Sequence, residues 1–389
     1  MGPSAVDGQR AFAHVRKLAV DIGPRVAGTA GEVTARDYLR TTLASYGYDV
    51  TLQDFGFDAS AFLPARVDVG PAPGPSTVTS IAAIALRGSG AGTVMGKYLI
   101  AAGIGRQDDF PAGGLAGDIA LIERGDLTFA QKVGNAIAAG ASAVVIYNNV
   151  PERGIFDLGD AVTIPVVGID QPAGQDLVAK IGAGRQEVRV TVSPPKGTAY
   201  NVVAKPKGGA PCETVSGGHY DSVPVTGGAD DNAAGTASVL ELARVVAAMK
   251  LTARHCFVLF SAEEFGLFGS KAYVEQLGAT ERAALRGMVN LDVVGTASGL
   301  DLIGSADLID LARIAAQKIG IETRVSSLPP NTGSDHLSFE DANIPVVMFY
   351  REDSLIHTDQ DSIEHIVPGS LAGTVSVALA TLQALAPGP

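Results

Sequence analysis

The sequence predicts an α/β protein: a mainly parallel, mixed sheet sandwiched by helices, with an inserted, mostly-β domain. From residue 200 onward, apolar strands alternate with long helical stretches, which is typical of a parallel sheet covered on both faces. Residues 77–193 show short apolar strands with one clear helix instead. Segments rich in proline and glycine, at 64–76 and 194–197, flank this region and indicate a linker or irregular edge. We therefore expect a discontinuous domain of residues 1–61 and 195–389, and an insert of residues 62–194.

The first 60 residues predict a helix, a turn, a second helix and a strand. Apolar residues recur at helical spacing over 12–19, and Gly23-Pro24 then breaks the helix. A second amphipathic stretch runs from Gly31 to Tyr46 and ends at Gly47. Residues 48–55 then alternate like a strand.

The insert contains five short apolar runs that predict strands and one run that predicts a helix. The strands are expected at Tyr98–Ala102, Asp118–Ile122, Ala143–Tyr147, Pro165–Ile169 and Val188–Val192, and the helix at Phe129–Ala139. The region from 77 to 193 has no histidine, no cysteine and no obvious catalytic cluster. We expect an interaction module or a lid rather than a site of chemistry.

The remaining residues supply the strands and helices of the main domain. Strands are expected at Asn201–Ala204, Thr214–His219, His255–Ser261, Gly287–Leu291, Asp301–Ile303 and Ile344–Phe349. Helices are expected at Ala234–Met249, Gly266–Leu277, Ala306–Ile319 and Ser370–Ala386. In such sheets, ligands bind beyond the carboxyl ends of the strands.

Polar residues follow the strands at that edge. An acidic residue after a strand is most often a helix N-cap, so no single one of them predicts a site. Five clusters of polar residues at one edge of the predicted sheet are much less readily explained by helix capping. They are His219 with Asp221, the Gly-rich loop with Asp230 and Asp231, Glu263 with Glu264, Asp292, and His357.

Two imidazoles with several carboxylates form a ligand set suited to zinc, with manganese or cobalt as substitutes. Two metal ions about 3.5–4 Å apart need a bridging carboxylate. The charges of two divalent ions would balance three ligand carboxylates and one hydroxide. Because an unbalanced buried charge is costly, this agreement favours a two-metal site.

The motifs together resemble a known family. They are Gly-Gly-His-Tyr-Asp-Ser (217–222), Gly-Ala-Asp-Asp-Asn-Ala-Ala-Gly (228–235), Ser-Ala-Glu-Glu-Phe-Gly-Leu-Phe-Gly-Ser (261–270), Asn-Leu-Asp (290–292) and His-Thr-Asp-Gln-Asp (357–361). Their order and spacing resemble the co-catalytic two-zinc aminopeptidases of the aminopeptidase Y and bacterial leucyl aminopeptidase group, which have the zinc exopeptidase fold. The segment 18–28 is also similar to the N-terminal segment of that family. Residues 117–129 and 139–149 resemble a protease-associated (PA) domain.

The resemblance implies a role for each residue of the predicted site. Asp231 would bridge the two metal ions, His219 and Asp292 would complete one of them, and Glu264 and His357 the other. Glu263 would be the general base, taking a proton from water and passing it to the leaving amine.

The resemblance also implies roles around this centre. Asp221 would orient the imidazole of His219. Asp335 and His336 would belong to a loop lining the substrate site, although a helix cap is the simpler interpretation of Asp335. Gly235 would allow the Asp231 loop a close approach. Asp230 is interpreted as a loop carboxylate rather than a ligand.

We therefore expect a metalloaminopeptidase acting on peptides with a free N-terminus. A dizinc carboxypeptidase or dipeptidase on the same scaffold is an alternative, and would need basic residues such as Arg324 and Arg351 to grip a terminal carboxylate. A glutaminyl cyclase and a receptor-like binding protein without catalysis are weaker alternatives. Ile356 stands where related enzymes often carry a tyrosine that stabilises the oxyanion, which puts the oxyanion donor in doubt.

Composition excludes some partners. The net charge of −12 argues against nucleic acid and against an anionic membrane surface. No apolar run is expected to reach the roughly 20 residues of a membrane span, and the N-terminus shows no signal-peptide pattern. Cys212 and Cys256 allow two alternatives, buried free thiols or one disulfide. We expect a secreted or extracellular protein, with a cytoplasmic one as the alternative.

Overall fold

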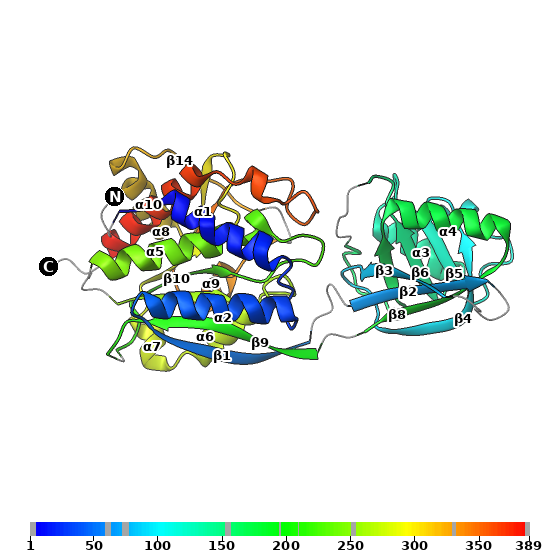
Figure 1. Ribbon diagram of the computed structural model, residues 1–389, viewed down its shortest axis with the longest axis horizontal. Coiled ribbons are helices and arrows are strands. Elements are labelled where there is room, and N and C mark those ends of the chain that lie inside the picture. Colours follow the sequence, from blue (N-terminus) through cyan, green and yellow to red (C-terminus); the bar gives the residue numbers. More distant parts are fainter. Residues whose placement is uncertain are drawn as a thin grey trace. The chain divides into compact units, whose positions relative to one another are not determined.

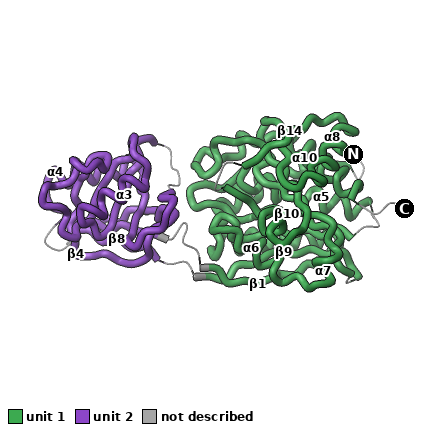
Figure 2. Tube along the Cα trace, turned by 180° about the vertical axis from the view of Figure 1, so that it is seen from behind, with its two compact units in different colours: residues 1–57, 197–389 green, residues 58–196 purple. Residues whose placement is uncertain are grey.

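The chain forms two compact units, one of which is inserted into the sequence of the other. The computed structural model describes residues 5–58, 64–71, 78–151, 157–193, 196–208, 210–249, 254–328 and 332–385. One unit, called here the core unit, contains residues 1–57 and 197–389, and the other, the insert, contains residues 58–196 (Figure 2). The boundaries predicted from the sequence, at 61/62 and 194/195, fall on residues outside the described ones.

An eight-stranded sheet in the order β1-β9-β11-β10-β12-β15-β13-β14 lies at the centre of the core unit (Figure 1). Strands β11, β10, β12 and β15 run parallel to their neighbours in this group, whereas β9 runs antiparallel to β11, and β13 to β15. The predicted mainly parallel, mixed sheet is therefore confirmed. The strands are β1 (Asp49–Asp58), β9 (Lys196–Lys205), β10 (Thr214–His219), β11 (His255–Phe260), β12 (Gly287–Leu291), β13 (Leu300–Gly304), β14 (Thr323–Val325) and β15 (Val346–Tyr350).

Helices cover both faces of this sheet. Side chains on β11 alternate between the faces: Phe257 and Leu259 pack into one core with helices α1, α2, α5, α8 and α10, while Val258 and Phe260 pack into another with α6 and α9. The sandwich predicted from the sequence is thus confirmed. The helices are α1 (Gly8–Arg16), α2 (Ala30–Ser45), α5 (Gly235–Met249), α6 (Phe268–Gln276), α7 (Ala279–Ala284), α8 (Ala306–Lys318), α9 (His336–Glu340) and α10 (Pro368–Leu385).

Helix α10 corrects one expectation. By length and composition alone it could cross a membrane, because its 18 residues have a mean hydropathy of 1.2. No such run was expected. Leu371, Val375 and Leu382 lie in the same core as α1, α5 and α8. Packing of this face against α1, α5 and α8 accounts for the apolar character of the helix.

The insert is a closed barrel in the order β2-β3-β7-β6-β5-β4-β8, and its described residues also form two α-helices. Alternate side chains of its central strands enter two cores: Leu121 and Val145 pack beside α4, and Ile122 and Val144 beside α3. The elements are β2 (Pro64–Pro71), β3 (Thr79–Ala85), β4 (Gly92–Ala101), β5 (Ile119–Glu123), α3 (Phe129–Ala138), β6 (Ala143–Tyr147), β7 (Val166–Ile169), α4 (Gln171–Ala183) and β8 (Gln186–Val192). The mostly-β insert is confirmed.

Three segments of the insert were misjudged from the sequence, one of them strand β3, which was not predicted. The expected linker at 64–76 contains strand β2 instead, which pairs with β3 and β8 and buries Val67 and Val69; residues 72–77 lie outside the described part. Helix α4, which contains one proline and two glycines, was also not predicted. Its Pro172 occupies the first turn, where proline is favourable, and Asp170 caps the helix through the N–H of Ala173.

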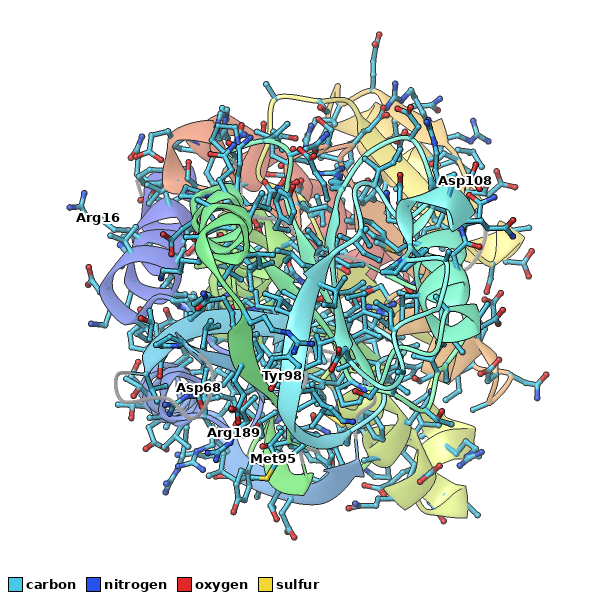
Figure 3. All side chains as sticks on the ribbon, turned by 90° about the vertical axis from the view of Figure 1, so that its right-hand side faces the viewer. Arg16, Asp68, Met95, Tyr98, Asp108 and Arg189 are labelled. Carbon is cyan, nitrogen blue, oxygen red and sulfur yellow. A yellow bond between two sulfur atoms is a disulfide. The ribbon has the colours of Figure 1, made fainter. Side chains whose placement is uncertain are left out.

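Charged groups on the outer surface of the barrel pair with one another. Figure 3 looks onto the insert and shows Asp68, Met95 and Arg189 close together, where they line a hollow of about 290 Å³. Asp68 accepts hydrogen bonds from Arg66 at 2.5 Å and from Ser80 at 2.6 Å. This carboxylate is therefore already paired with groups of the barrel itself.

The two cysteines form a disulfide. Cys212, just before β10, is joined to Cys256 in β11, and their Cα atoms lie 5.7 Å apart. The free-thiol alternative is therefore excluded. The bond ties together two neighbouring strands whose far ends lead to the polar clusters.

Candidate metal centre

Four neighbouring parallel strands place the predicted site residues at one edge of the sheet. His219 is the last residue of β10, Glu263 and Glu264 follow β11 by a few residues, Asp292 follows β12 directly, and His357 lies in the loop after β15. Because parallel strands end at the same edge, all of these side chains meet there. Asp231 reaches the same place from the loop that leads into α5.

Asp231 lies between the two histidines. Its Oδ1 is 3.2 Å from Nε2 of His219, and its Oδ2 is 3.0 Å from Nε2 of His357. His219 Nε2 is also 3.3 Å from Oδ1 of Asp292, and His357 Nε2 is 3.2 Å from Oε2 of Glu264. The five side chains therefore form two groups, each with one histidine and one further carboxylate, that share Asp231.

Asp221 organises one side of this arrangement. Its Oδ1 lies 3.5 Å from Nδ1 of His219, and its two carboxylate oxygens accept the N–H groups of Glu263 and Glu264 at 3.2 and 3.4 Å. Glu263 Oε2 lies 4.0 Å from Nε2 of His219. Asp221 is fully buried. Through these contacts it holds both the histidine ring and the turn that carries the two glutamates.

Burial and charge act against each other at this centre. Burial lowers the pKa of His219, but nearby carboxylates, Asp292 and then Glu263, outweigh it and hold that pKa well above its usual value. Burial likewise lowers the pKa of His357, and Glu264 and Asp231 raise it well above normal. Burial also raises the pKa of Asp231, but hydrogen bonds from the two imidazoles outweigh it and hold that pKa far below normal. The site is thus a cluster of carboxylates that requires positive charge.

The donor set fits divalent metal ions. Two groups of side chains could each hold an ion, His219 with Glu263 and Asp292, and His219 with Asp231 and Glu264. Oε1 of Glu264 is buried and has no hydrogen-bond partner among the described residues, as expected of an atom reserved for a ligand. Imidazole and carboxylate together suit zinc. Glu263 is a member of the first group by distance, although the role predicted for it is that of a general base and not of a metal ligand.

Asp335 and His336 lie at the start of α9. The Asp335 side chain makes no cap hydrogen bond, so the interpretation as a helix cap was wrong. Its carboxylate is buried, and the nearby Ser270 hydroxyl favours the charged form. Burial raises the pKa of Asp335 to about 7 against the opposing charge of His219, while burial lowers the pKa of His336 to about 4. Burial, and then the charges of Glu264 and Asp335, raise the pKa of Glu263 well above its usual value.

Two neighbours of Asp231 have structural roles. Asp230 accepts the N–H of Gly295 at 2.6 Å, in agreement with its interpretation as a loop carboxylate. A Cβ atom on Gly235 would lie 2.0 Å from the carbonyl oxygen of Leu291, so only glycine allows α5 to approach the end of β12 this closely.

Sequence reasoning missed two buried charged residues at this centre, Arg25 and Asp361. Arg25 donates to several backbone carbonyls, and Asp361 accepts the N–H groups of Asp230 and Asp231. Arg25 lies in the segment 18–28 and Asp361 ends the His357 motif. The available signal for Arg25 was its position directly after Gly-Pro. The signal for Asp361 was that it is a second acidic residue in the motif of a predicted ligand histidine.

Comparison with known proteins identifies relatives of both units. The family model described as Peptidase family M28 matches residues 201–382, and that of the PA domain matches residues 90–177. Aminopeptidase YwaD of Bacillus subtilis is 36% identical over 386 residues, covering 92% of this chain and 80% of that protein. A probable leucine aminopeptidase 2 of Aspergillus fumigatus is 37% identical over 227 residues, covering 53% of this chain and 45% of that protein.

Solved structures agree with these matches over the whole chain. The structure of BSAP, a zinc aminopeptidase from Bacillus subtilis, superposes with a TM-score of 0.80 at 32% identity, covering 97% of this chain and 94% of that one. An aminopeptidase from Aneurinibacillus sp. strain AM-1 gives a TM-score of 0.66 at 30% identity, with coverage of 99% and 96%. The relatives match the sheet, the insert and the strands that carry the polar cluster. The chain belongs to peptidase family M28.

Proposed function

We propose that this chain is a zinc-dependent aminopeptidase that removes N-terminal residues from peptides and holds two zinc ions. His219 and Asp292 would hold one ion, Glu264 and His357 the other, and Asp231 would bridge them. One observation carries this proposal: the two oxygens of Asp231 face different histidines, at 3.2 and 3.0 Å. A carboxylate placed in this way can bind two ions at once, one through each oxygen.

When bound, zinc supplies Lewis acidity, which polarises the scissile carbonyl and lowers the pKa of water. The chain supplies the proton transfers. Glu263 accepts the proton of the attacking water at its carboxylate and delivers it to the leaving amine. The side chain of Glu263 is only 11% exposed, so few other waters compete for that proton. Asp221 keeps the His219 ring in orientation from behind.

The charges around the centre favour an amine over a carboxylate as the recognised substrate end. Carboxylate oxygens of Asp292 and Glu263 lie 3.3 and 4.0 Å from Nε2 of His219, and a protonated α-amine is attracted to groups placed in this way. The two arginines considered for gripping a terminal carboxylate are engaged elsewhere. Arg324 holds Asp301 with two hydrogen bonds, at 2.7 and 3.0 Å, and Arg351 donates to the carbonyl of Ser298. This disposition favours the aminopeptidase over the carboxypeptidase.

We further propose that the protein works outside the cytoplasm. The Cys212–Cys256 disulfide supports this, since such bonds persist in oxidising compartments. Fractionation of the native host, followed by detection of the chain, tests the proposal. Recovery mainly from the cytosol, with reduced cysteines, would contradict it.

The decisive experiment compares two substrates that differ only at the amine. The zinc-loaded protein is assayed on leucyl-p-nitroanilide and on its N-acetylated form, with and without a chelator, and bound zinc is counted per chain. We expect two zinc ions and chelator-sensitive cleavage of the free amine substrate alone. Cleavage of the acetylated substrate at a similar rate would exclude an aminopeptidase. Two bound ions without cleavage of either substrate would direct the search to carboxypeptidase and dipeptidase substrates.

A further inference from the structure

The loop that carries Asp231 is held by a buried cation. We call residues 226–231 the bridge loop. The Arg25 side chain is fully buried and donates hydrogen bonds to the carbonyls of Gly227 and Gly228, the latter at 3.2 Å. Hydrogen bonds from a charged donor are stronger than neutral ones, so this part of the loop is firmly anchored.

The same guanidinium also reaches the strand end that carries His219. Its Nε donates to the carbonyl of Tyr220 at 2.7 Å, and the backbone N–H of Arg25 donates to Oγ of Ser222 at 3.0 Å. Among the described residues Arg25 forms no salt bridge, and its charge is balanced at longer range by Asp221 and Asp361. The hydrogen bonds to carbonyls and the charges of these two carboxylates offset part of the cost of burying the cation.

A buried carboxyl group holds the other side of the bridge loop. Asp361, 3% exposed, accepts the N–H of Asp230 at 2.7 Å and the N–H of Asp231 at 3.2 Å. Its carbonyl accepts the hydroxyl of Thr226 at 2.7 Å. Asp361 lies four residues after His357. It therefore connects the loop of one histidine to the loop of the bridging carboxylate.

We propose that Arg25 and Asp361 are positioning residues that clamp the bridge loop, so that both oxygens of Asp231 are aimed before metal binds. This inference rests on the proposed function. Arg25 fixes the loop through its carbonyls, and Asp361 fixes it through its amides. Without the clamp, the bridge loop would become ordered only when metal binds. The loss of conformational entropy would then be subtracted from the free energy of metal binding, and the affinity would be weaker.

Matched variants separate positioning from general stability. Asp361→Asn keeps the size of the side chain but replaces one accepting oxygen with a donor, which cannot pair with an amide N–H. Thr226→Val removes the hydroxyl link at nearly constant shape, and Thr226→Ser restores it. Arg25→Lys keeps the charge but loses the planar fork. Asp301→Asn is the control: it makes the same change in a buried carboxylate at the β13–β14 edge, outside the bridge loop.

The measurement is zinc affinity of the folded, metal-free chain, titrated against a chromogenic chelator, together with the visible spectrum of the cobalt-substituted protein. Thermal unfolding is recorded for every variant. We expect Asp361→Asn to bind zinc about 10- to 100-fold more weakly, as for other groups that orient metal ligands. Thr226→Val should show a smaller loss, and Thr226→Ser and Asp301→Asn should match the wild type. At saturating zinc, kcat should fall more than KM rises.

Several results would overturn the clamp. One is a folded Asp361→Asn variant with the zinc affinity and cobalt spectrum of the wild type. Another is an equal loss in Asp301→Asn, because it would assign the effect to stability. If Arg25→Lys does not fold, Asp361→Asn and the Thr226 pair decide the matter. A wild-type chain that binds no zinc would contradict the proposed function instead, so the two failures are distinguishable.

Discussion

The core unit and the insert are both built around apolar cores, but they differ in how many charged side chains they bury. Both bury strands against helices, and both have apolar cores. In the described part of the insert, Lys132 is the one charged side chain that is buried, and its Nζ donates to the carbonyls of Ile104 and Glu123. The core unit buries many charged groups, Arg25, Asp231 and Asp361 among them.

The difference separates a scaffold from a site. Burying a charged group costs several kcal/mol unless it is paired, so a fold under no chemical demand avoids it. The insert follows that rule almost completely. The core unit departs from it most densely where four parallel strands end, whereas buried carboxylates elsewhere, such as Glu241 and Asp301, are each paired with an arginine. Buried charge therefore indicates where the chemistry lies, and the following predictions test that contrast.

The largest effect is expected from Asp231→Ala. Removal of the shared carboxylate would leave each of the two proposed ions with one protein ligand fewer. We expect zinc content to fall below two ions per chain and peptidase activity to fall to background, measured by metal analysis and by hydrolysis of leucyl-p-nitroanilide. A variant that keeps two ions and wild-type activity would show that Asp231 is no bridge.

Glu263→Gln should separate metal binding from proton transfer. The amide cannot accept the proton of water, so kcat should fall by a factor on the order of 10² or more while zinc content stays at the wild-type value. Steady-state kinetics on the metal-loaded variant tests this. Unchanged kcat would remove Glu263 from the mechanism, and lost zinc would assign it to the ligand set instead.

A pair of leucines tests whether the insert contributes only packing. Leu121 in β5 and Leu259 in β11 are both buried, one in each unit. Leu→Ala at either position should lower the free energy of unfolding by roughly 2–5 kcal/mol. Only Leu259→Ala, on a strand that leads to the glutamates, should also weaken zinc binding. Weaker zinc binding in a folded Leu121→Ala variant would contradict the claim that the insert contributes only packing.

The smallest effect concerns acid stability. Burial, followed by the charges of Arg10 and Arg244, lowers the pKa of His14 to about 4. In the unfolded chain a histidine titrates near pH 6.5, so between these values the unfolded state binds a proton that the folded state does not. Stability is therefore lost as pH falls from about 7 to 4, by a few kcal/mol at most.

His14→Gln should flatten this loss in urea unfolding at several pH values. The residues from 77 to 193 contain no histidine, so transitions of the insert should show no such contribution. Parallel pH profiles for wild type and variant would refute the assignment to His14.

Much of the fold was predictable where burial leaves a simple pattern. Strands β10 and β12 are buried along their whole length, and their predicted bounds agree with the structure. Strand β2 was not predicted, because its proline and glycine residues conceal the alternation of Val67 and Val69. Strand β14, with three residues, is too short for any period to be visible.

The candidate site was predictable for a related reason. The predicted ligands follow strands, and the edge of a parallel sheet brings them together without knowledge of loop conformation. Their individual roles stay predictions. Arg25 and Asp361 were missed because they act on backbone carbonyls and amides, which leave no periodic trace in the sequence.

The way the insert joins the core unit has a consequence for how the chain folds. In the barrel, the first and last strands pair, with Ala65 opposite Val192. In the core unit, β1 and β9 are neighbours, and Phe57 lies against Gly197. A barrel that folds first brings its own ends together and so shortens the effective loop between β1 and β9. Since loop closure becomes more costly with length, early folding of the insert lowers the entropic barrier to completing the edge of the sheet.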